Sequence, residues 1–185
     1  MKEKIIILAA GKGKRMGGSL PKVLTQVKGK SMLQRKMEQV LKLEIDKKPT
    51  IVIGYKRKLV IKDLEQNGQK YNYVHQKKEL GTGHAVSSAR NSLLSKAKNI
   101  IILYGDQPLI RAETIKEIHQ KHLKSGKKIT MATVKLKDFR SWRKNFANVS
   151  RIIRDKNGKI IKDVQFQDAS VQEKKIKEIN PCCFC

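Results

Sequence analysis

The residues best suited to chemistry lie in a cationic, glycine-rich segment that follows the apolar residues 5–7. Its glycines and cations are Gly11, Gly13, Gly17, Gly18, Lys12, Lys14, Arg15 and Lys22. Glycines let the backbone turn with positive φ and approach a ligand closely, while backbone amides point inward as donors. Fixed positive charge beside such amides suits the oxygens of a polyphosphate. The segment therefore predicts a polyphosphate-binding loop, and the alternative is a loop that only turns the chain.

The spacing excludes two widespread phosphate motifs. No Gly-Lys-Ser/Thr closes the segment, as a P-loop requires. The Gly-x-Gly-x-x-Gly pattern fails as well, because Met16 occupies the last glycine position.

A second chemical group, Asp106, follows the apolar run 99–104 in the sequence Gly-Asp-Gln-Pro-Leu. The carboxyl edge of a parallel sheet is where α/β proteins bind ligands. Mg²⁺ takes one or two carboxylates and completes its shell with phosphate oxygens and water. Asp106 is therefore a candidate magnesium ligand, although an aspartate in such a turn is also a common turn former.

A third candidate segment spans residues 76–86. Gly81, Thr82 and Gly83 precede a helical pattern, so free backbone amides and a hydroxyl would face the crevice. The residues alone leave two readings open, a ligand-contacting helix start and a plain N-terminal cap. His84 is interpreted as a helix residue rather than a catalyst.

These residues need an α/β framework, and the hydrophobic pattern supplies one. Apolar runs and helical periodicities alternate at lengths that predict right-handed β-α-β crossovers and a mostly parallel sheet. The expected strands are 5–7, 50–53, 71–75, 99–104 and 128–134, and the expected helices are 31 to about 43, 56–66, 82 to about 94, and 114–123. Ser31 is the expected cap of the first helix. His119 and His122 share one face of the last helix and are expected on the surface, and 151–159 is an expected hairpin turning at Asn157-Gly158.

Composition narrows the class of protein. A chain of 185 residues with 39% hydrophobic residues fits one domain with a core. The net charge of +26 is spread through the sequence, and with one Trp and 5% aromatics the chain has few stacking groups. We therefore expect incidental polyanion binding but no specific nucleic-acid partner. The short apolar run 5–8 indicates a first strand rather than a secretory signal, and no run is long enough to span a membrane, so we expect a cytoplasmic protein.

The cysteines are confined to one end of the sequence. Cys182, Cys183 and Cys185 have no second cluster that would complete a zinc site or a disulfide framework. Reduced thiols in or beside a strand are the expected state.

Two of these segments resemble a known family. Leu8 to Met16, with Leu20-Pro21-Lys22, resembles the Leu-Ala-Ala-Gly-x-Gly-x-Arg-Met and Leu-Pro-Lys signature of sugar-nucleotide pyrophosphorylases. Gln76 and the Leu-Gly-Thr-Gly-His-Ala sequence from Leu80 resemble the uracil-recognition segment of bacterial N-acetylglucosamine-1-phosphate uridylyltransferases, the N-terminal half of a bifunctional enzyme. The resemblance covers nearly all of residues 4–180. It implies a three-layer, Rossmann-like nucleotidyltransferase domain of the nucleotide-diphospho-sugar transferase type over residues 1–185.

The resemblance also implies a reaction, in which UTP and N-acetylglucosamine 1-phosphate give UDP-N-acetylglucosamine, a cell-wall precursor, and pyrophosphate. Its implied catalytic residues are Arg15, Lys22 and Asp106, with Asp106 holding Mg²⁺. The implied nucleotide-binding residues are Leu8, Ala9, Ala10, Gly11, Gly13, Arg15, Lys22, Gln76, Gly81 and Thr82. The implied sugar-binding residues are Tyr104, Gly105, Ser150, Gln165 and Asn180.

The sequence departs from the family at the sugar-binding positions. Ser150 replaces a glycine, Gln165 replaces a glutamate, and Pro181 follows Asn180 where the family has threonine. The family's C-terminal part, with a second metal-binding Asn and a β-helix acetyltransferase domain, is expected to be missing. Two alternatives therefore stay open. One is a same-fold nucleotidyltransferase with another base or acceptor, such as the molybdenum-cofactor guanylyltransferases, and the other is a nucleotide-binding remnant without turnover.

Overall fold

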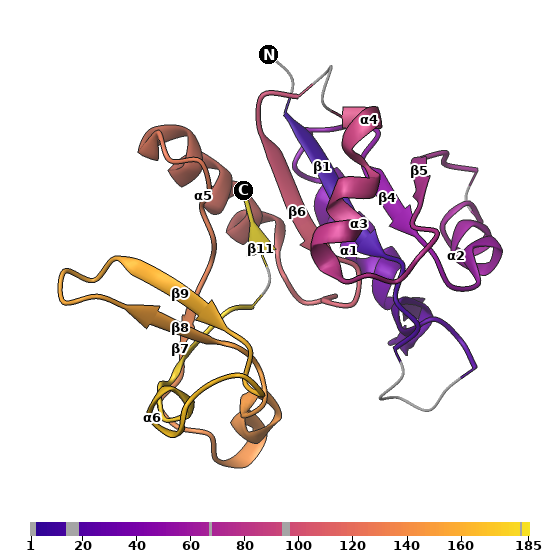
Figure 1. Cartoon of the computed structure of the whole chain (residues 1–185). Coiled ribbons are helices and arrows are strands. Elements are labelled where there is room, and N and C mark those ends of the chain that lie inside the picture. The colour runs from indigo at the N-terminus through magenta and orange to yellow at the C-terminus, as the bar shows by residue number, and fades with distance from the viewer. Residues whose placement is uncertain (1–2, 14–18, 67, 94–96, 182) are drawn as a thin grey trace. The chain divides into compact units, whose positions relative to one another are not determined.

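The computed structural model describes residues 3–13, 19–66, 68–93, 97–181 and 183–185 (Figure 1). The chain forms two compact units. The first comprises residues 1–130 with 184–185, and the second comprises residues 131–183.

The first unit is built on a five-stranded sheet in the order β11-β6-β1-β4-β5. Its strands are β1 (Lys4–Ala9), β4 (Thr50–Ile53), β5 (Asn72–His75), β6 (Ile100–Tyr104) and β11 (Cys183–Phe184). The pairs β1 with β4, β1 with β6, and β4 with β5 are all parallel, as predicted for a mostly parallel sheet. A short hairpin of β2 (Gln26–Val27) and β3 (Lys30–Ser31) completes the strands of this unit.

The strand order changes direction at β1. From β1 the chain moves outward to β4 and β5, and then returns to place β6 on the other side of β1 (Figure 1). At such a reversal the connections leave in opposite directions, so a crevice opens beyond the carboxyl ends of the two central strands. The ends of β1 and β6 are therefore the expected ligand-binding edge.

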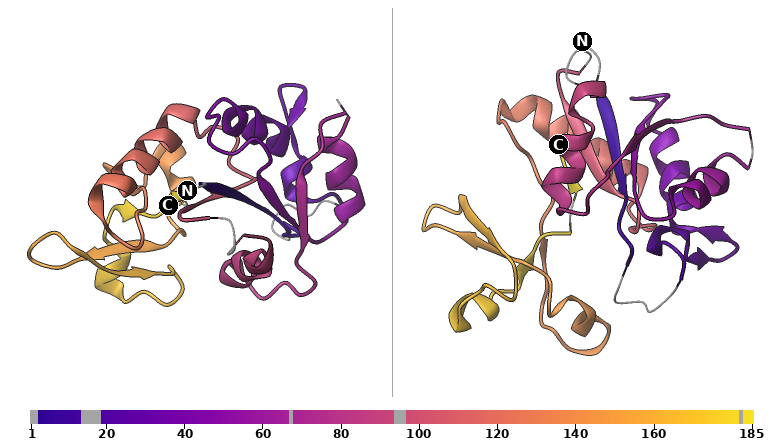
Figure 2. Two further views of the ribbon diagram at one scale, coloured as in Figure 1. Left: turned by 90° about the horizontal axis from the view of Figure 1, so that it is seen from above. Right: turned by 45° about the vertical axis from the view of Figure 1, so that its right-hand side comes forward.

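Helices cover both faces of this sheet. They are α1 (Met32–Leu41), α2 (Arg57–Leu64), α3 (Thr82–Ser88), α4 (Arg90–Leu93) and α5 (Ala112–Ser125), with a 3₁₀ turn, η2 (Lys22–Leu24). Ile6 and Val52 pack with Ala85 and Ala89 in one buried cluster, which places α3 on that face. The alternate residue Ile7 points to the opposite face because strand side chains alternate. Viewed from above, the purple α1 and the pink α3 lie on opposite sides of the sheet (Figure 2), and the three-layer fold is confirmed.

The predicted cap of α1 is confirmed. The Ser31 side chain accepts a hydrogen bond from the Gln34 amide, and the Gln34 side chain accepts one from the Ser31 amide, both at 3.0 Å. This reciprocal pair satisfies two donors that the start of a helix leaves unpaired. The Ser31 hydroxyl also donates to Asp63 Oδ2 at 2.7 Å, which ties α1 to α2.

The predicted helix from Thr82 is divided into α3 and α4. Ser88 Oγ donates to the His84 carbonyl at 2.8 Å, and the Ala89 amide donates to Val86 O, three residues back. A serine hydroxyl that bonds the carbonyl four residues earlier competes with the helix ladder and bends it. A tighter turn at Ala89 therefore separates two short helices.

The predicted surface positions of His119 and His122 are wrong. Their exposed fractions are 9% and 8%. Ile115, Ile118, His119 and His122 follow the i, i+3, i+4, i+7 spacing of a buried helix face, so both imidazoles lie on the packed side of α5. His119 Nε2 lies 3.5 Å from Glu3 Oε2, and His122 Nδ1 lies 3.0 Å from Thr130 Oγ1.

The predicted strand 128–134 is also wrong. Thr130 exchanges two backbone hydrogen bonds with Cys185, at 2.7 and 2.8 Å, and the chain then passes from the first unit to the second. Within 128–134 only Val134 belongs to a strand, the two-residue β7 (Val134–Lys135). Cys185, beside β11, is buried, whereas Cys182 lies outside the described residues.

The second unit holds a four-stranded sheet in the order β7-β10-β8-β9, with antiparallel pairs. Its elements are β7 (Val134–Lys135), η3 (Ser141–Phe146), β8 (Arg151–Arg154), β9 (Ile160–Val164), α6 (Val171–Lys174) and β10 (Glu178–Ile179). The predicted hairpin joins β8 to β9. Asp155 Oδ1 accepts from the amides of Asn157 and Lys159, both at 2.9 Å, and Gly158 has φ +77°.

A buried arginine organises this second unit. Arg151 is 1% exposed, and its guanidinium lies 4.5 Å from the Phe139 ring centroid and 5.0 Å from that of Phe166. It donates to the carbonyls of Ala147, Val149 and Lys174. Burial lowers the pKa of Arg151, and the aromatic and carbonyl contacts compensate for the lost hydration of its charge.

Replacing the α1 cap tests this description of the first unit. Ser31→Ala removes the cap and the bond to Asp63, so we expect the free energy of unfolding to fall by about 2 kcal/mol. Ser170 caps α6 with the same reciprocal pair but is exposed, so Ser170→Ala is the matched control and should cost at most about 1 kcal/mol. Denaturant unfolding measures both, and equal costs would contradict the role of the buried Ser31–Asp63 bond.

Candidate functional site

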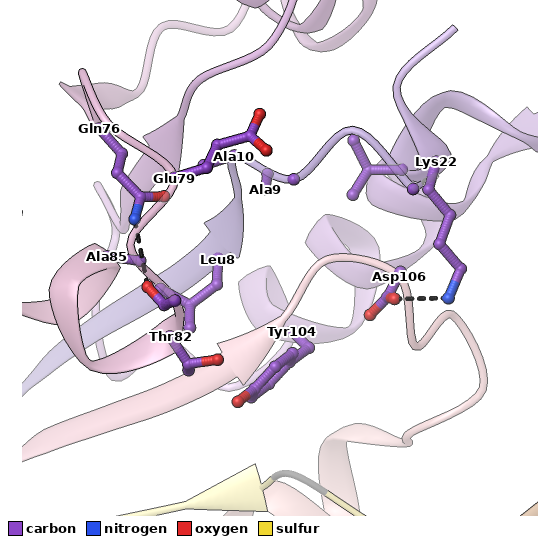
Figure 3. Close-up of a pocket in the computed structure, with 14 residues that line it drawn as sticks. Leu8, Ala9, Ala10, Lys22, Gln76, Glu79, Thr82, Ala85, Tyr104 and Asp106 are labelled. Carbon is purple, nitrogen blue, oxygen red and sulfur yellow. Dashed lines mark hydrogen bonds and ion pairs between the residues drawn. The ribbon is translucent and has the colours of Figure 1, made fainter. Parts of the chain in front are cut away.

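A cavity of about 480 Å³ lies at the carboxyl ends of β1 and β6, within the first unit (Figure 3). It is lined by Leu8, Ala9, Ala10, Gly11, Gly13, Lys22, Val23, Gln76, Glu79, Gly81, Thr82, Ala85, Tyr104 and Asp106. These residues come from the end of β1 and the loop after it, from η2, from the segment between β5 and α3, from α3, and from the end of β6 with the residues that follow it. The reversal of strand order thus coincides with a real cavity.

Gly13 lets the loop after β1 reach Lys22. It has φ +71°, and a Cβ at this position would lie 2.5 Å from Lys22 Cβ, closer than any side chain tolerates. Lys22 itself is fixed because Val23 and Leu24, the next residues of η2, are 4% and 8% exposed. The glycine-rich loop and the lysine are therefore one packed arrangement.

The end of β1 is also held from the β4 side. The Tyr55 amide donates to Ala10 O at 3.0 Å, and a Cβ on Gly54 would lie 2.7 Å from the same oxygen. Lys12 Nζ lies 5.0 Å from the centroid of the Tyr55 ring, a cation–π contact. These contacts fix the part of the loop that lines the cavity.

Lys22 and Asp106 form an ion pair at one end of the cavity, with Nζ 2.8 Å from Oδ2 (Figure 3). Their side chains are 38% and 28% exposed, so both charges remain accessible to a ligand. The position of Asp106 follows from the sheet, because the Gly105 amide donates to Leu8 O at 2.9 Å. An ammonium and a carboxylate at this end can serve an anionic ligand and a cation together.

Gly105 lies behind the cavity lining. A Cβ there would lie 3.0 Å from Leu33 Cδ1 and 3.2 Å from Leu8 O, so the close packing of β1, β6 and α1 explains the glycine. Tyr104, its neighbour at the end of β6, does line the cavity.

The donor set near Asp106 suits a metal that is shared with a ligand. Among the residues that the structure describes, no group of three or more His, Cys, Asp or Glu side chains could hold a metal ion. Asp106 supplies one carboxylate, and Mg²⁺ characteristically takes one or two carboxylates together with substrate phosphates and water. The residues present therefore fit Mg²⁺ bound along with a polyphosphate.

Gln76 lies at the other end of the cavity (Figure 3), within hydrogen-bond distance of Gly81. Gln76 is 5% exposed, and its amide group donates from Nε2 to Gly81 O at 3.2 Å. The same nitrogen lies 3.0 Å from His84 Nδ1. Gly81 has φ 91° and ψ −179°, a conformation open to glycine, and Thr82 follows it as the first residue of α3.

Sequence reasoning did not single out Val23, Glu79 and Ala85, which also line the cavity. Ala85 follows Gly81 by four residues, so helical spacing could have indicated it. Val23 adjoins Lys22, but its apolar side chain carried no chemical signal. Glu79 lies in an irregular segment, whose path the hydrophobic pattern does not determine.

The remaining predicted residues lie elsewhere. Arg15 lies outside the described residues. Ser150, Gln165 and Asn180 belong to the second unit, where Ser150 and Asn180 are both 6% exposed and Gln165 is exposed. Asn180 Nδ2 donates to Asp163 Oδ2 at 2.6 Å. The sugar-binding roles of these three residues stay predictions.

The parallel sheet with its cavity at the strand reversal defines a Rossmann-like nucleotidyltransferase fold. The family described as MobA-like NTP transferase domain matches residues 5–159, and the chain belongs to this family. Among the solved structures, HddC from Yersinia pseudotuberculosis has a TM-score of 0.71 at 19% identity, covering 100% of this chain and 76% of that one. CMP:2-keto-3-deoxy-manno-octonic acid synthetase complexed with CTP has a TM-score of 0.71 at 18% identity, covering 100% and 73%.

Sequence relatives are closer. The chain is 35% identical to the bifunctional protein GlmU of Caldicellulosiruptor saccharolyticus, covering 100% of this chain and 38% of that protein. It is 41% identical to GlmU of Bacillus velezensis, covering 97% and 37%, and 36% identical to GlmU of Desulfotalea psychrophila, covering 98% and 50%. The chain thus spans half or less of these relatives, and the resemblance to the N-terminal domain of the bifunctional enzyme is confirmed.

No helix within the described ranges is long and apolar enough to cross a membrane.

A pair of glycine substitutions tests the packing of the loop on Lys22. Gly13 and Gly29 have φ +71° and +79°, but a Cβ on Gly29 would meet nothing within 4 Å. Both changes to alanine carry the strain of a left-handed conformation, about 1 kcal/mol. Gly13→Ala adds the collision with Lys22 Cβ, so we expect it to lower the free energy of unfolding by at least about 1 kcal/mol more than Gly29→Ala. Equal losses in denaturant unfolding would show that the loop does not pack on Lys22.

Proposed function

We propose that this chain binds UTP in the cavity and transfers its uridylyl group to N-acetylglucosamine 1-phosphate, releasing pyrophosphate. The observation that carries the proposal is the division of the cavity into two ends. Lys22 and Asp106 form one end with an ion pair, and Gln76 and Thr82 line the other end, where Gln76 bonds Gly81 O and the exposed carboxylate of Glu79 lies toward solvent (Figure 3). A nucleoside triphosphate has the same division, with charged phosphates and a neutral base.

The phosphate end supports in-line phosphoryl chemistry. A phosphate oxygen of the sugar attacks the α-phosphorus of UTP, and the bond from that phosphorus to the oxygen bridging to the β-phosphate breaks. Such a reaction needs positioning and charge neutralisation more than a covalent catalyst. The amides of Gly11 and Gly13, with Arg15, hold the β- and γ-phosphates, and the Lys22 ammonium bridges the α-phosphate and the sugar phosphate.

In the proposed reaction, Lys22 and Asp106 exchange their ion pair for contacts with the substrates. When the phosphates enter, Lys22 turns from the carboxylate to the phosphate oxygens, and the Asp106 carboxylate is left to coordinate a divalent cation. Asp106 would hold a Mg²⁺ ion, which would supply positive charge near the leaving pyrophosphate. Partial exposure of both side chains supports this exchange, because neither has to leave a buried position.

The base is assigned by resemblance together with position. Gln76, Gly81 and Thr82 read uracil at their end of the cavity, where Leu8, Ala9 and Ala10 complete the nucleotide-binding surface. The sugar-binding roles of Tyr104, Gly105, Ser150, Gln165 and Asn180 are proposed on the resemblance alone. The proposal places the reaction in the cytoplasm, where UTP and the sugar phosphate are available.

Pyrophosphate release tests the proposed reaction. With UTP and Mg²⁺ present, we expect release that depends on added N-acetylglucosamine 1-phosphate. Replacing UTP by CTP or GTP should lower it strongly. Pyrophosphate release that does not depend on the sugar phosphate, or that is faster with another nucleotide, would contradict the assigned substrates. UTP binding without any pyrophosphate release would indicate a nucleotide-binding domain that lacks turnover.

A lysine comparison tests the catalytic arrangement. Lys22→Ala should lower turnover by about 10²- to 10³-fold, the usual loss when one group that stabilises transition-state charge is removed. Lys30 also pairs with a carboxylate, that of Glu38, but it does not line the cavity. Lys30→Ala is therefore the matched control, with turnover expected within about twofold, since exposed ion pairs contribute little. Similar turnover in both variants would remove Lys22 from the mechanism.

A further inference from the structure

We propose that His84 is a positioning residue that locks the side-chain amide of Gln76, so that Gln76 presents a hydrogen-bond acceptor to the base and favours uracil over cytosine. This inference rests on the proposed function, because it concerns the base of the same nucleotide. It assigns a role to a histidine that does not itself line the cavity.

The orientation of the Gln76 amide follows from its first neighbour. Gly81 O lies 3.2 Å from one terminal atom of the side chain. A backbone carbonyl oxygen can only accept a hydrogen bond, so the atom facing it is the Nε2 nitrogen, which donates. Reversing the amide would place two oxygen atoms against each other.

His84 provides the second hydrogen-bond acceptor for the Gln76 side chain. The same Nε2 nitrogen lies 3.0 Å from His84 Nδ1. The nitrogen carries two hydrogens, one for Gly81 O and one for the imidazole, so Nδ1 accepts and the ring proton resides on Nε2 of His84. Both hydrogens of the Gln76 amide are then used within the protein.

The lock is rigid because both residues are fixed independently. The backbone N–H of Gln76 donates to Ile53 O at 2.8 Å, which continues the pairing of β4 and β5. His84 lies on α3 immediately before Ala85, which is 4% exposed in the cluster with Ile6 and Val52. One acceptor is the carbonyl of Gly81, the N-cap of α3, and the other is on α3 itself, and they hold the side-chain amide of a residue that is 5% exposed.

The Gln76 side chain has one further polar atom, its Oε1 oxygen. With both Nε2 hydrogens engaged, the Gln76 side chain offers a ligand only its Oε1 oxygen, an acceptor. In the proposed pose this oxygen faces the ring nitrogen N3. N3 of uracil carries a hydrogen and donates to it, whereas N3 of cytosine is an acceptor, and the cytosine ring would have to shift to bring its N4 amine, a donor, to the oxygen. A site whose polar group is held in one orientation rejects the base that leaves this group unpaired.

Two substitutions at His84 distinguish the effect of its hydrogen-bond acceptor from the effect of its side-chain volume. The Oδ1 atom of asparagine stands at the same number of bonds from the backbone as Nδ1 of histidine, so His84→Asn keeps an acceptor. His84→Leu fills similar space without one. Ser88→Ala, which removes the hydroxyl bound to the His84 carbonyl on the same helix, is the control for disturbance of α3.

The measurement is the dissociation constant of UTP and of CTP for each protein, determined by competition with a fluorescent nucleotide in the presence of Mg²⁺. We expect His84→Leu to lower the preference for UTP over CTP by about tenfold, the effect of one buried hydrogen bond. His84→Asn and Ser88→Ala should keep the preference within about threefold of the unaltered chain. Binding is measured rather than turnover, so the result does not depend on the sugar or on catalysis.

The outcomes distinguish this inference from the proposed function. An unaltered chain that binds neither nucleotide, or binds both equally, overturns the uracil assignment and the inference with it. A selective unaltered chain with an equally selective His84→Leu variant overturns the inference alone. Loss of selectivity in both His84 variants, with unchanged thermal stability, also overturns it, because the ring itself and not its acceptor would then be responsible.

Discussion

Two backbone hydrogen bonds at the carboxyl end of β1 are the constraint on which the site depends. The Gly105 amide donates to Leu8 O from the β6 side, and the Tyr55 amide donates to Ala10 O from the β4 side. They extend the sheet past the last paired residues of β1 and direct residues 10–13 toward the cavity at the strand reversal. Asp106 and the loop are consequently fixed to the same strand end.

The remaining site residues reach this point by packing. Lys22 is held by the buried Val23 and Leu24 and lies against Gly13, while Gln76 follows β5 and faces the start of α3. Both ends of the cavity therefore belong to one rigid sheet edge. Preorganised charge of this kind suits phosphoryl transfer, in which the protein contributes position and electrostatics.

Much of this unit could be predicted from the sequence. The apolar runs of β1, β4 and β6 and the Ser31 cap carry strong local signals. Eleven of the fourteen residues that line the cavity are residues that the sequence predicts for the site. Tertiary effects explain the rest. His119 and His122 are buried because their spacing coincides with the packed face of α5, and residues 128–134 pass from one unit to the other with only Val134 in a strand. The contact of Gln76 with His84 depends on how the segment between β5 and α3 folds back, which no periodicity determines.

The most direct test of the account is a crystal structure of the chain with UTP and Mg²⁺. The account predicts the triphosphate beside Gly11, Gly13 and Lys22, the metal on Asp106, and the uracil ring against Gln76 and Gly81. A nucleotide bound outside this cavity, or bound with its base at Lys22 and Asp106, would contradict it.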